Sequence, residues 1–200
     1  KGLQSIDLKH RAAQVAYLAQ GAPAHWPISV HRLVELGRLP HLGPWARLQK
    51  GDRRAVERAM ALADVGHLAS RRMNTLSTGE QVRVLVARLL AVEPKLILAD
   101  EPIAALDPLH QLQIMNVLKT HCARGGTAVV VLHDLTLAAR FCAELALLHQ
   151  GQSVLQGRPE FVLTAQTLVD VYGVEAKFAS IEDQLYVVPW APTSAPNSTA

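Results

Sequence analysis

The sequence of 200 residues has few cysteines and no long apolar run, and each shortage argues against a class of protein. Its two cysteines, Cys122 and Cys142, show no metal-ligand spacing. This argues against a disulfide-stabilised scaffold and a zinc site and favours two reduced thiols in a cytosolic protein. No apolar run approaches the ~20 residues that a helix needs to cross a bilayer, so the sequence predicts no membrane span.

The sequence also has little concentrated charge and few aromatic residues. Its net charge is +3, and aromatic side chains make up 4% of the chain. Adjacent basic residues occur only as Arg53 with Arg54 and Arg71 with Arg72, and no aromatic residue is interleaved with them. A nucleic-acid-binding surface would show both features together, so we expect no nucleic-acid partner and assign most charges to solvated helix faces.

Half of the chain is hydrophobic, which is enough for one real core, and its pattern alternates between strands and helices. Continuous apolar runs predict strands, with 151–157 pairing back on the last of them as a hairpin, and helical spacing predicts helices. The predicted strands are 12–20, 95–100, 127–134 and 144–150, and the predicted helices are 28–36, 52–65, 79–92, 109–124 and 135–143. Residues 21–27 and 37–45 are expected to be loops because they are rich in Gly and Pro. Strands buried on both faces and alternating with helices indicate an α/β fold with a doubly wound parallel sheet.

The domain organisation follows from the same pattern. A helix-rich block at about 26–88 interrupts the alternation, and we interpret it as a helical subdomain set into one domain that covers residues 1–190. Residues 191–200, APTSAPNSTA, are expected to form a disordered tail because of their composition.

Ionisable or amide side chains follow the predicted strands at the point where each strand ends. The first strand ends at Gln20, the second at Asp100 and Glu101, and the third at His133 and Asp134. Since ligands of open α/β sheets bind at the carboxyl ends of the strands, these are the candidate site residues.

The run LILADEP at 96–102 is a hydrophobic strand ending in an acid, which is the Walker B pattern. Asp100 would hold Mg²⁺, which prefers hard oxygen ligands. Glu101 would activate the water that attacks a γ-phosphate, and general-base help of this kind contributes about 10²–10⁴ in rate. The alternative is that the two acids only cap the next helix.

The run LSTGE at 76–80 leads directly into an apolar helix. Ser77 and Glu80 form a capping box, yet the exposed N–H groups of a helix start also bind phosphate. Two further residues allow two interpretations. Asp107, followed by Pro108, is either a plain helix cap or a functional group, and His133 is either structural or a hydrogen-bond donor to a terminal phosphate.

In order and spacing from about residue 12 to 175, these motifs resemble the ATP-binding subunits of ABC transporters. Gln20 matches the Q-loop, residues 76–80 the signature motif, Asp100 and Glu101 Walker B, residues 105–107 the D-loop, and His133 the switch histidine. The resemblance implies a P-loop NTPase-like (RecA-like) fold with an inserted helical subdomain. Three further runs resemble the importers of metal chelates, meaning iron–siderophore, heme or cobalamin: VHRLVELGRLPH, VLHDLTLAARFCAELALLHQGQSVLQG and VLTAQTLVDVYGVEAKF.

The resemblance implies an ATPase that uses ATP and Mg²⁺ and pairs head to tail with a second ATP-binding subunit. Ser77 and Gly79 would bind the γ-phosphate held by the partner, Gln20 would sense Mg²⁺ and the attacking water, and Asp107 would span the dimer interface. The subunit would lie on the cytoplasmic face of a bacterial inner membrane, bound to permease subunits and served indirectly by a periplasmic or surface substrate-binding protein. Contact with the permease would involve the coupling-surface residues, for which a plain turn is the alternative: Gly37, Arg38, Pro40 and His41.

The sequence departs from this family in two places. It contains no Gly-Lys pair, so it lacks the G-x-x-x-x-G-K-[ST] loop that cradles phosphates, and it starts with Lys rather than Met. We therefore expect an N-terminally truncated part of a longer ATPase that is inactive alone. The alternatives are a module that lends its signature motif to an intact ATPase, and a soluble ABC protein outside transport. Thr78 stands where the family usually has Gly, and its β-branch restricts the backbone.

Overall fold

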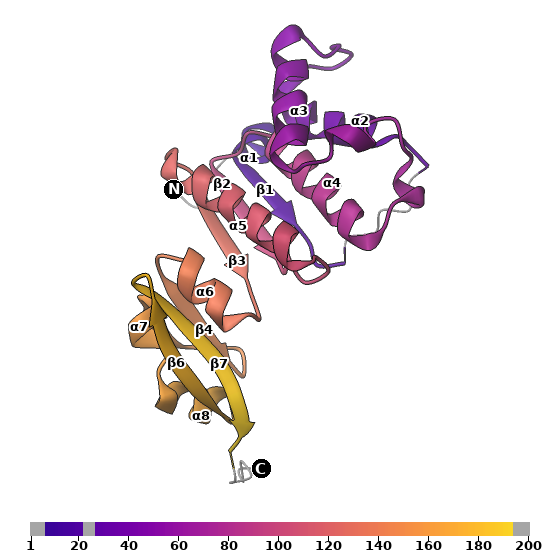
Figure 1. Ribbon diagram of the computed structural model, residues 1–200. Coiled ribbons are helices and arrows are strands. Elements are labelled where there is room, and N and C mark those ends of the chain that lie inside the picture. Colours follow the sequence, from indigo (N-terminus) through magenta and orange to yellow (C-terminus); the bar gives the residue numbers. More distant parts are fainter. Residues whose placement is uncertain (1–6, 22–26, 194–200) are drawn as a thin grey trace. The chain divides into compact units, whose positions relative to one another are not determined.

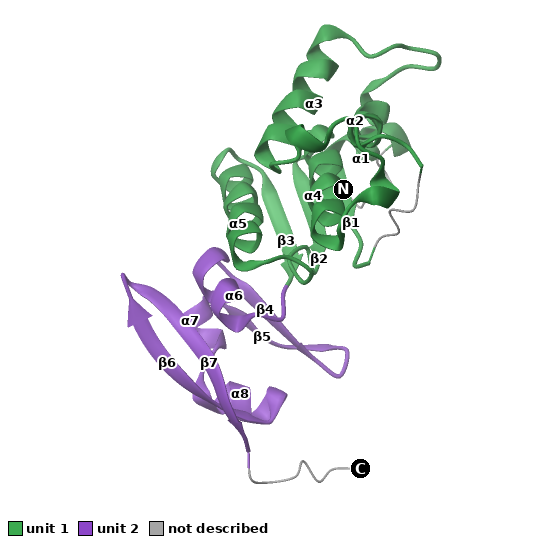
Figure 2. Cartoon of the chain, turned by 45° about the vertical axis from the view of Figure 1, so that its right-hand side comes forward, with its two compact units in different colours: residues 1–131 green, residues 132–200 purple. Residues whose placement is uncertain are grey.

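The structure of the chain is a computed structural model that describes residues 7–21 and 27–193. It divides into two compact units, residues 1–131 and residues 132–200, each of which is described by itself (Figure 2). The sequence predicts one domain over residues 1–190, so the boundary after Val131 is a new feature.

The first unit is built on a three-stranded parallel sheet. Its strands are β1 (Val15–Leu18), β2 (Leu96–Asp100) and β3 (Thr127–Val131), in the order β1-β2-β3. Leu18 pairs with Ala99, and Asp100 pairs with Val131, so all three strands end at the same edge. The parallel α/β core predicted from the sequence is therefore confirmed.

Only one face of this sheet is covered within the described part of the chain. Ala16, Ile97 and Ala99 are buried on the covered face, and α4 (Thr78–Ala91) and α5 (Pro108–Ala123) contact the sheet. On the opposite face, Tyr17 and Val129 are 57% and 56% exposed. The burial on both faces that the apolar runs predicted is thus seen on one face only.

All helices of the inserted region lie between β1 and β2 in sequence (Figure 1). They are α2 (Val30–Glu35), η2 (Leu36–His41), α3 (Lys50–Leu62), η3 (Gly66–Leu68), η4 (Met73–Thr75) and α4. Helix α4 is their centre because it contacts both α2 and α3 and buries most of its apolar side chains, Val84 and Leu85 among them. Each such aliphatic side chain stabilises the fold by about 1.5–3 kcal/mol.

Three predicted boundaries are wrong for identifiable physical reasons. Residues 12–14 were expected in a strand but end α1 (Leu8–Gln14), which Asp7 caps by accepting from the His10 N–H over 3.2 Å. Residues 37–41, which Gly and Pro predicted to be loop, belong to the 3-10 helix η2, Leu36–His41. Helix α3 begins at Lys50 with Gln49 as its cap, and Asp52 is the other member of that capping box rather than the cap itself.

The second unit combines short helices with two antiparallel hairpins. Its elements are α6 (Leu135–Phe141), β4 (Leu145–His149), β5 (Gln152–Gly157), α7 (Pro159–Val162), α8 (Ala165–Tyr172), β6 (Val174–Ile181) and β7 (Gln184–Pro192). The predicted hairpin of β4 and β5 is present, and it is separate from the parallel sheet. The core of the second unit is a cluster of four buried residues: Leu135, Leu163, Leu168 and Val187.

The β6–β7 hairpin was not predicted, and it shortens the expected tail. Strand β7 includes Ala191 and Pro192, which the sequence analysis placed in the tail. Residues 194–200, the rest of that tail, lie outside the described residues. Among the helices that the structure describes, none is long and apolar enough to cross a membrane.

Candidate functional site

The carboxyl edge of the parallel sheet brings together three of the predicted site residues. Asp100 is the last residue of β2, and Glu101 follows it. Strand β1 ends at Leu18, opposite Ala99, and Gln20 lies two residues further along the chain. The structure therefore places Gln20, Asp100 and Glu101 at one edge, as the apolar runs predicted.

Glu101 has an unusual backbone conformation for its residue type. Its φ of 48° lies in the left-handed region, and its N–H donates to the carbonyl of Val131 over 3.2 Å. For a residue with a side chain this conformation costs about 1–2 kcal/mol, and such strain concentrates at functional sites. This hydrogen bond connects the residue that follows β2 to the last residue of β3.

The signature turn starts α4 through a complete capping box. The Ser77 hydroxyl accepts from the Glu80 N–H over 3.3 Å, and the Ser77 N–H donates to the Glu80 carboxylate over 2.8 Å. The same carboxylate also accepts from the Ser77 hydroxyl over 3.1 Å. The backbone hydrogen bond from Ser77 is the main reason why the pKa of Glu80 lies below its usual value. The local interpretation of this motif is thus confirmed.

One further residue, which the sequence analysis missed, braces this turn. The side-chain amide of Gln81 donates to the carbonyl of Met73 over 3.2 Å and to that of Leu76 over 3.1 Å. The turn is therefore held from both sides of Ser77. The sequence gives no signal for this role, because Gln81 meets its two acceptors only once η4 has folded.

The signature turn lies beside the predicted D-loop within the first unit. A Cβ atom placed on Gly79 would meet the carbonyl oxygen of Ala105 at 3.4 Å and the side chain of Leu106 at 3.6 Å. Two motifs that are 26 positions apart (Gly79 to Ala105) are thus in contact. Leu106 is buried, which anchors the loop.

Asp107 has the geometry of an ordinary helix cap. Its carboxylate accepts from the His110 N–H over 3.1 Å and contacts the His110 imidazole Nδ1 at 2.5 Å. The contact with His110 is the main reason why the pKa of Asp107 is lowered. Its predicted role at a dimer interface stays a prediction.

His133 belongs to the second unit, two residues beyond β3. It precedes Asp134, which caps α6 by accepting from the Leu137 N–H over 2.7 Å. The position of His133 at the nucleotide site therefore stays a prediction.

The predicted coupling surface is partly internal. Gly37 is buried so closely against α4 that a Cβ atom would lie 2.3 Å from the carbonyl oxygen of Arg88. Arg38 is 7% exposed and donates to Asp52, Ala91 and Glu93. Both residues are therefore internal to the first unit, and their predicted contact with a permease stays a prediction.

The other two members of that set lie nearer the surface. Pro40 is half-buried and His41 is exposed, with its Nε2 atom 2.7 Å from the carbonyl oxygen of Val92. Their contact with a membrane subunit stays a prediction. The structure does show that the whole segment is attached to the end of α4.

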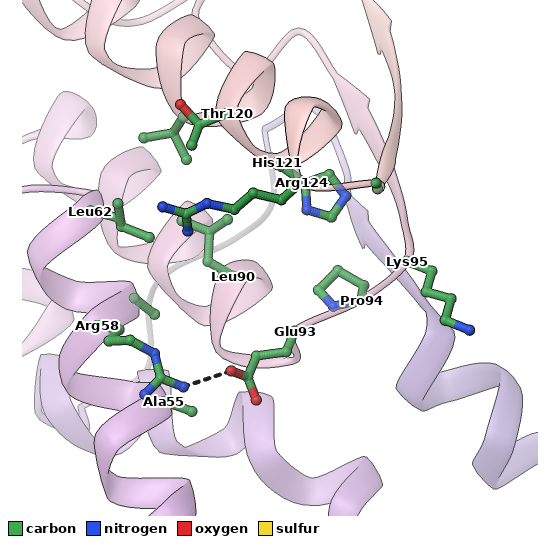
Figure 3. A pocket seen from close by; sticks show the side chains of 14 residues that line it. Ala55, Arg58, Leu62, Leu90, Glu93, Pro94, Lys95, Thr120, His121 and Arg124 are labelled. Carbon is green, nitrogen blue, oxygen red and sulfur yellow. Dashed lines mark hydrogen bonds and ion pairs between the residues drawn. The ribbon is translucent and has the colours of Figure 1, made fainter.

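A cavity of about 370 Å³ lies elsewhere in the first unit, between α3, the end of α4 and α5 (Figure 3). Pro94 and Lys95, which line it, precede β2, and Gly125 and Gly126 precede β3. It therefore opens at the amino-terminal ends of the strands, whereas ligands of such sheets bind at the carboxyl ends. This cavity is not the predicted nucleotide site.

The carboxyl edge of the sheet offers few donors to a metal ion. Within the described residues, no three His, Cys, Asp or Glu side chains form a group that could hold a metal ion. Mg²⁺ needs no such group, because it is commonly bound by one or two carboxylates together with substrate phosphates. Asp100, with the amide of Gln20 at the same edge, fits that kind of site.

Comparisons with known proteins agree with this geometry. The model of the ABC transporter family matches residues 1–104. The hemin import ATP-binding protein HmuV of Pseudomonas entomophila is 42% identical over 172 residues, which are 84% of this chain and 66% of that protein. The ferric enterobactin transport ATP-binding protein FepC of Escherichia coli is 36% identical over 173 residues, which are 86% of this chain and 64% of that protein.

A solved structure shows the same fold. The ATP-binding cassette MJ0796, a dimer in a post-hydrolysis state bound to ADP and Pi, has a TM-score of 0.66 and 29% identity, covering 78% of this chain and 68% of that chain. This similarity confirms the P-loop NTPase-like class expected from the motifs. The chain spans slightly less than two thirds of the two curated relatives above. The family model and the two relatives together show that this chain belongs to the ATP-binding proteins of the ABC transporter family.

Proposed function

We propose that the chain is part of the ATP-hydrolysing subunit of an importer for a metal chelate, such as hemin or a ferric siderophore. The observation that carries this proposal is the placement of Gln20, Asp100 and Glu101 at one sheet edge, in a unit that also presents a capped signature turn. The relatives support the substrate class, since one is named for hemin import and the other for ferric enterobactin transport.

At the sheet edge, Asp100 would hold Mg²⁺, and Gln20 would orient the water beside it. The metal, when bound, neutralises negative charge on the terminal phosphates of ATP. Glu101 would accept the proton of the attacking water, and His133 would donate a hydrogen bond to the γ-phosphate. The left-handed backbone of Glu101, directly after β2, supports its role because such strain concentrates at functional sites.

The signature turn would serve a nucleotide held by a second ATP-binding subunit, paired head to tail. Ser77 is exposed, and the N–H groups near Gly79 lie at the positive end of α4, where a phosphate is stabilised. Asp107 would lie at the interface of the two subunits. The dimeric cassette bound to ADP and Pi supports this arrangement.

Permease subunits and, indirectly, a substrate-binding protein complete the proposed transporter, with this subunit on the cytoplasmic face of a bacterial inner membrane. The segment with Pro40 and His41 would contact the permease. Because this segment is attached to the end of α4, its displacement would be transmitted to the signature turn at the start of the same helix.

Substitution of Glu101 by Gln tests this proposal in a protein that carries the chain together with a P-loop. We expect E101Q to lower the rate of ATP hydrolysis by about 10²-fold or more, with ATP binding retained. The matched control is E57Q, which removes an exposed carboxylate on α3 and should leave the rate unchanged. Hydrolysis by E101Q at the wild-type rate would contradict the assigned base.

A further inference from the structure

The connection between η2 and α3 leaves the body of the first unit and returns at the start of α3, as Figures 1 and 2 both show. Trp45 lies in this connection and is completely exposed, with a relative exposure of 101%. Its φ of 63° is in the left-handed region, which is rare for a bulky residue. Leu39, just before the connection, is 58% exposed. A protein surface rarely presents a tryptophan so fully, because its ring gains by burial.

The charged side chains of the same connection are all positive. No acidic residue occurs between Leu36 and Gly51, and the next one, Asp52, binds the buried guanidinium of Arg38 over 3.0 Å. The cations around the connection are exposed, and none forms an ion pair with another described residue: Arg47, Lys50, Arg53 and Arg54. We name residues 42–54 the Trp45 tip.

Two of these cations repel each other within the chain, while Glu57 lies about one turn beyond Arg53 and Arg54 on the same helix. Lys50 and Arg54 are four residues apart in α3, so they lie on the same face of the helix and repel each other. Lys50 also lies in the first turn of α3, where the helix dipole disfavours a cation. An anionic surface opposite the Trp45 tip would relieve both effects.

We propose that the Trp45 tip binds the anionic lipid headgroups of a membrane surface. The indole ring of Trp45 has an apolar body and one N–H donor, which suits the boundary between headgroups and acyl chains. The cations beside it would approach the headgroup phosphates, and each cation near such a surface strengthens binding. The pairing of one exposed aromatic anchor with four unpaired cations is what identifies a lipid surface.

Charge complementarity favours lipid over a membrane protein at this tip. The cytoplasmic loops of membrane proteins are enriched in Lys and Arg, so they would repel Arg47, Lys50 and Arg54. The cytoplasmic leaflet, by contrast, carries a negative surface potential. This choice of the cytoplasmic leaflet rests on the proposed function, whereas vesicle binding needs no ATP and no permease, so its failure would leave the proposed transport function intact.

Vesicle binding by the full chain of residues 1–200 tests the proposal. The chain has three tryptophans, so W26F/W190F leaves Trp45 as the only indole reporter. With vesicles of phosphatidylcholine containing about a quarter phosphatidylglycerol, we expect co-sedimentation, a blue shift of Trp45 emission and protection from an aqueous quencher. Vesicles of pure phosphatidylcholine should give none of these, and added salt should weaken the binding.

Two variants and one matched control decide the outcome. Removing two cations with K50Q/R54Q should weaken binding to the anionic vesicles by about 25-fold, because each cation contributes about a factor of five. W45A should also weaken binding, whereas K9Q/R124Q, which removes two exposed cations elsewhere, should change it little. Equal binding by K50Q/R54Q and K9Q/R124Q would overturn the proposal. So would a Trp45 emission that shifts only when a permease is added.

Discussion

The guanidinium of Arg38 donates a hydrogen bond over 2.7 Å to the backbone carbonyl of Ala91, the last residue of α4. Its other donors reach Asp52 over 3.0 Å and Glu93 over 2.9 Å, so one side chain joins η2, α3 and the end of α4. Ser77 caps the opposite end of the same helix. Segment η2 and the signature turn are therefore attached to opposite ends of one helix.

The first prediction concerns the stability that Arg38 contributes. R38A leaves the largely buried carboxylate of Asp52 without its cationic partner and the carbonyl of Ala91 without its side-chain donor, so we expect a loss of about 3 kcal/mol in the free energy of unfolding. R38K keeps the charge but has no planar fork, so it should recover only part of this loss. Urea denaturation measures both values.

An exposed arginine provides the control for that measurement. Arg32 pairs with Glu35 on the surface of α2, and R32A should cost less than about 0.5 kcal/mol. An R38A variant no less stable than R32A would mean that the buried network contributes nothing.

The second prediction compares two glycines with opposite surroundings. A Cβ atom on Gly37 would lie 2.3 Å from a backbone oxygen and 2.9 Å from the Cβ of Ala91, so G37A must displace η2 from α4. We expect G37A to lower the free energy of unfolding by about 1–3 kcal/mol. Gly51 is helical and has no neighbour within 4 Å, so G51A should raise it by about 0.5–1 kcal/mol. Thermal unfolding of both variants measures the two changes in stability. A change of the same sign in G37A and G51A would refute the prediction.

The third prediction concerns pH and the capping box. The pKa of Glu80 is lowered from 4.5, chiefly by the Ser77 N–H, so the folded state binds this proton less readily than the unfolded chain. The carboxylate therefore contributes stability above pH 4.5, and this contribution is lost as the pH falls through the folded-state pKa.

The variants E80Q and S77A test this sign. E80Q should be less stable than the wild type near neutral pH, and the difference should shrink as the pH falls below 4.5. S77A should cost about 1 kcal/mol through the lost cap. Urea denaturation at several pH values gives both results, and a difference for E80Q that is independent of pH would contradict the lowered pKa.

The sheet and its functional edge could be predicted from the sequence because their signals are local. An apolar run that ends in an acid identifies both the strand and its carboxyl end, which is how Asp100 was found. The burial of Arg38 could not be predicted, because its partners Ala91 and Glu93 are 53 and 55 positions away in the sequence. Gly and Pro around Arg38 indicated a loop, whereas contact with α4 holds these residues in a helical turn.

The β6–β7 hairpin was not predicted for a different reason. Its turn is formed by Glu182 and Asp183, which both have positive φ values, 52° and 59°. Hairpin turns of this kind are usually identified by Asn-Gly or Asp-Gly, and a Glu-Asp pair gives no such signal. The turn is stabilised by the strands that it joins, with Ile181 paired to Gln184, rather than by its own residues.

The last prediction concerns Thr78, which replaces the Gly usual in the signature motif. Its β-branch would matter if the position required a left-handed backbone, but Thr78 is the first residue of α4 and is not among the described residues with positive φ. An ordinary helical conformation suits Thr slightly better than Gly, so T78G should lower the free energy of unfolding by about 0.5 kcal/mol. T78A, which has the higher helix propensity, should raise it by a similar amount. Urea denaturation of the two variants separates an ordinary helical backbone from a strained one. A gain in stability with T78G would show that Thr78 holds a strained backbone at the turn.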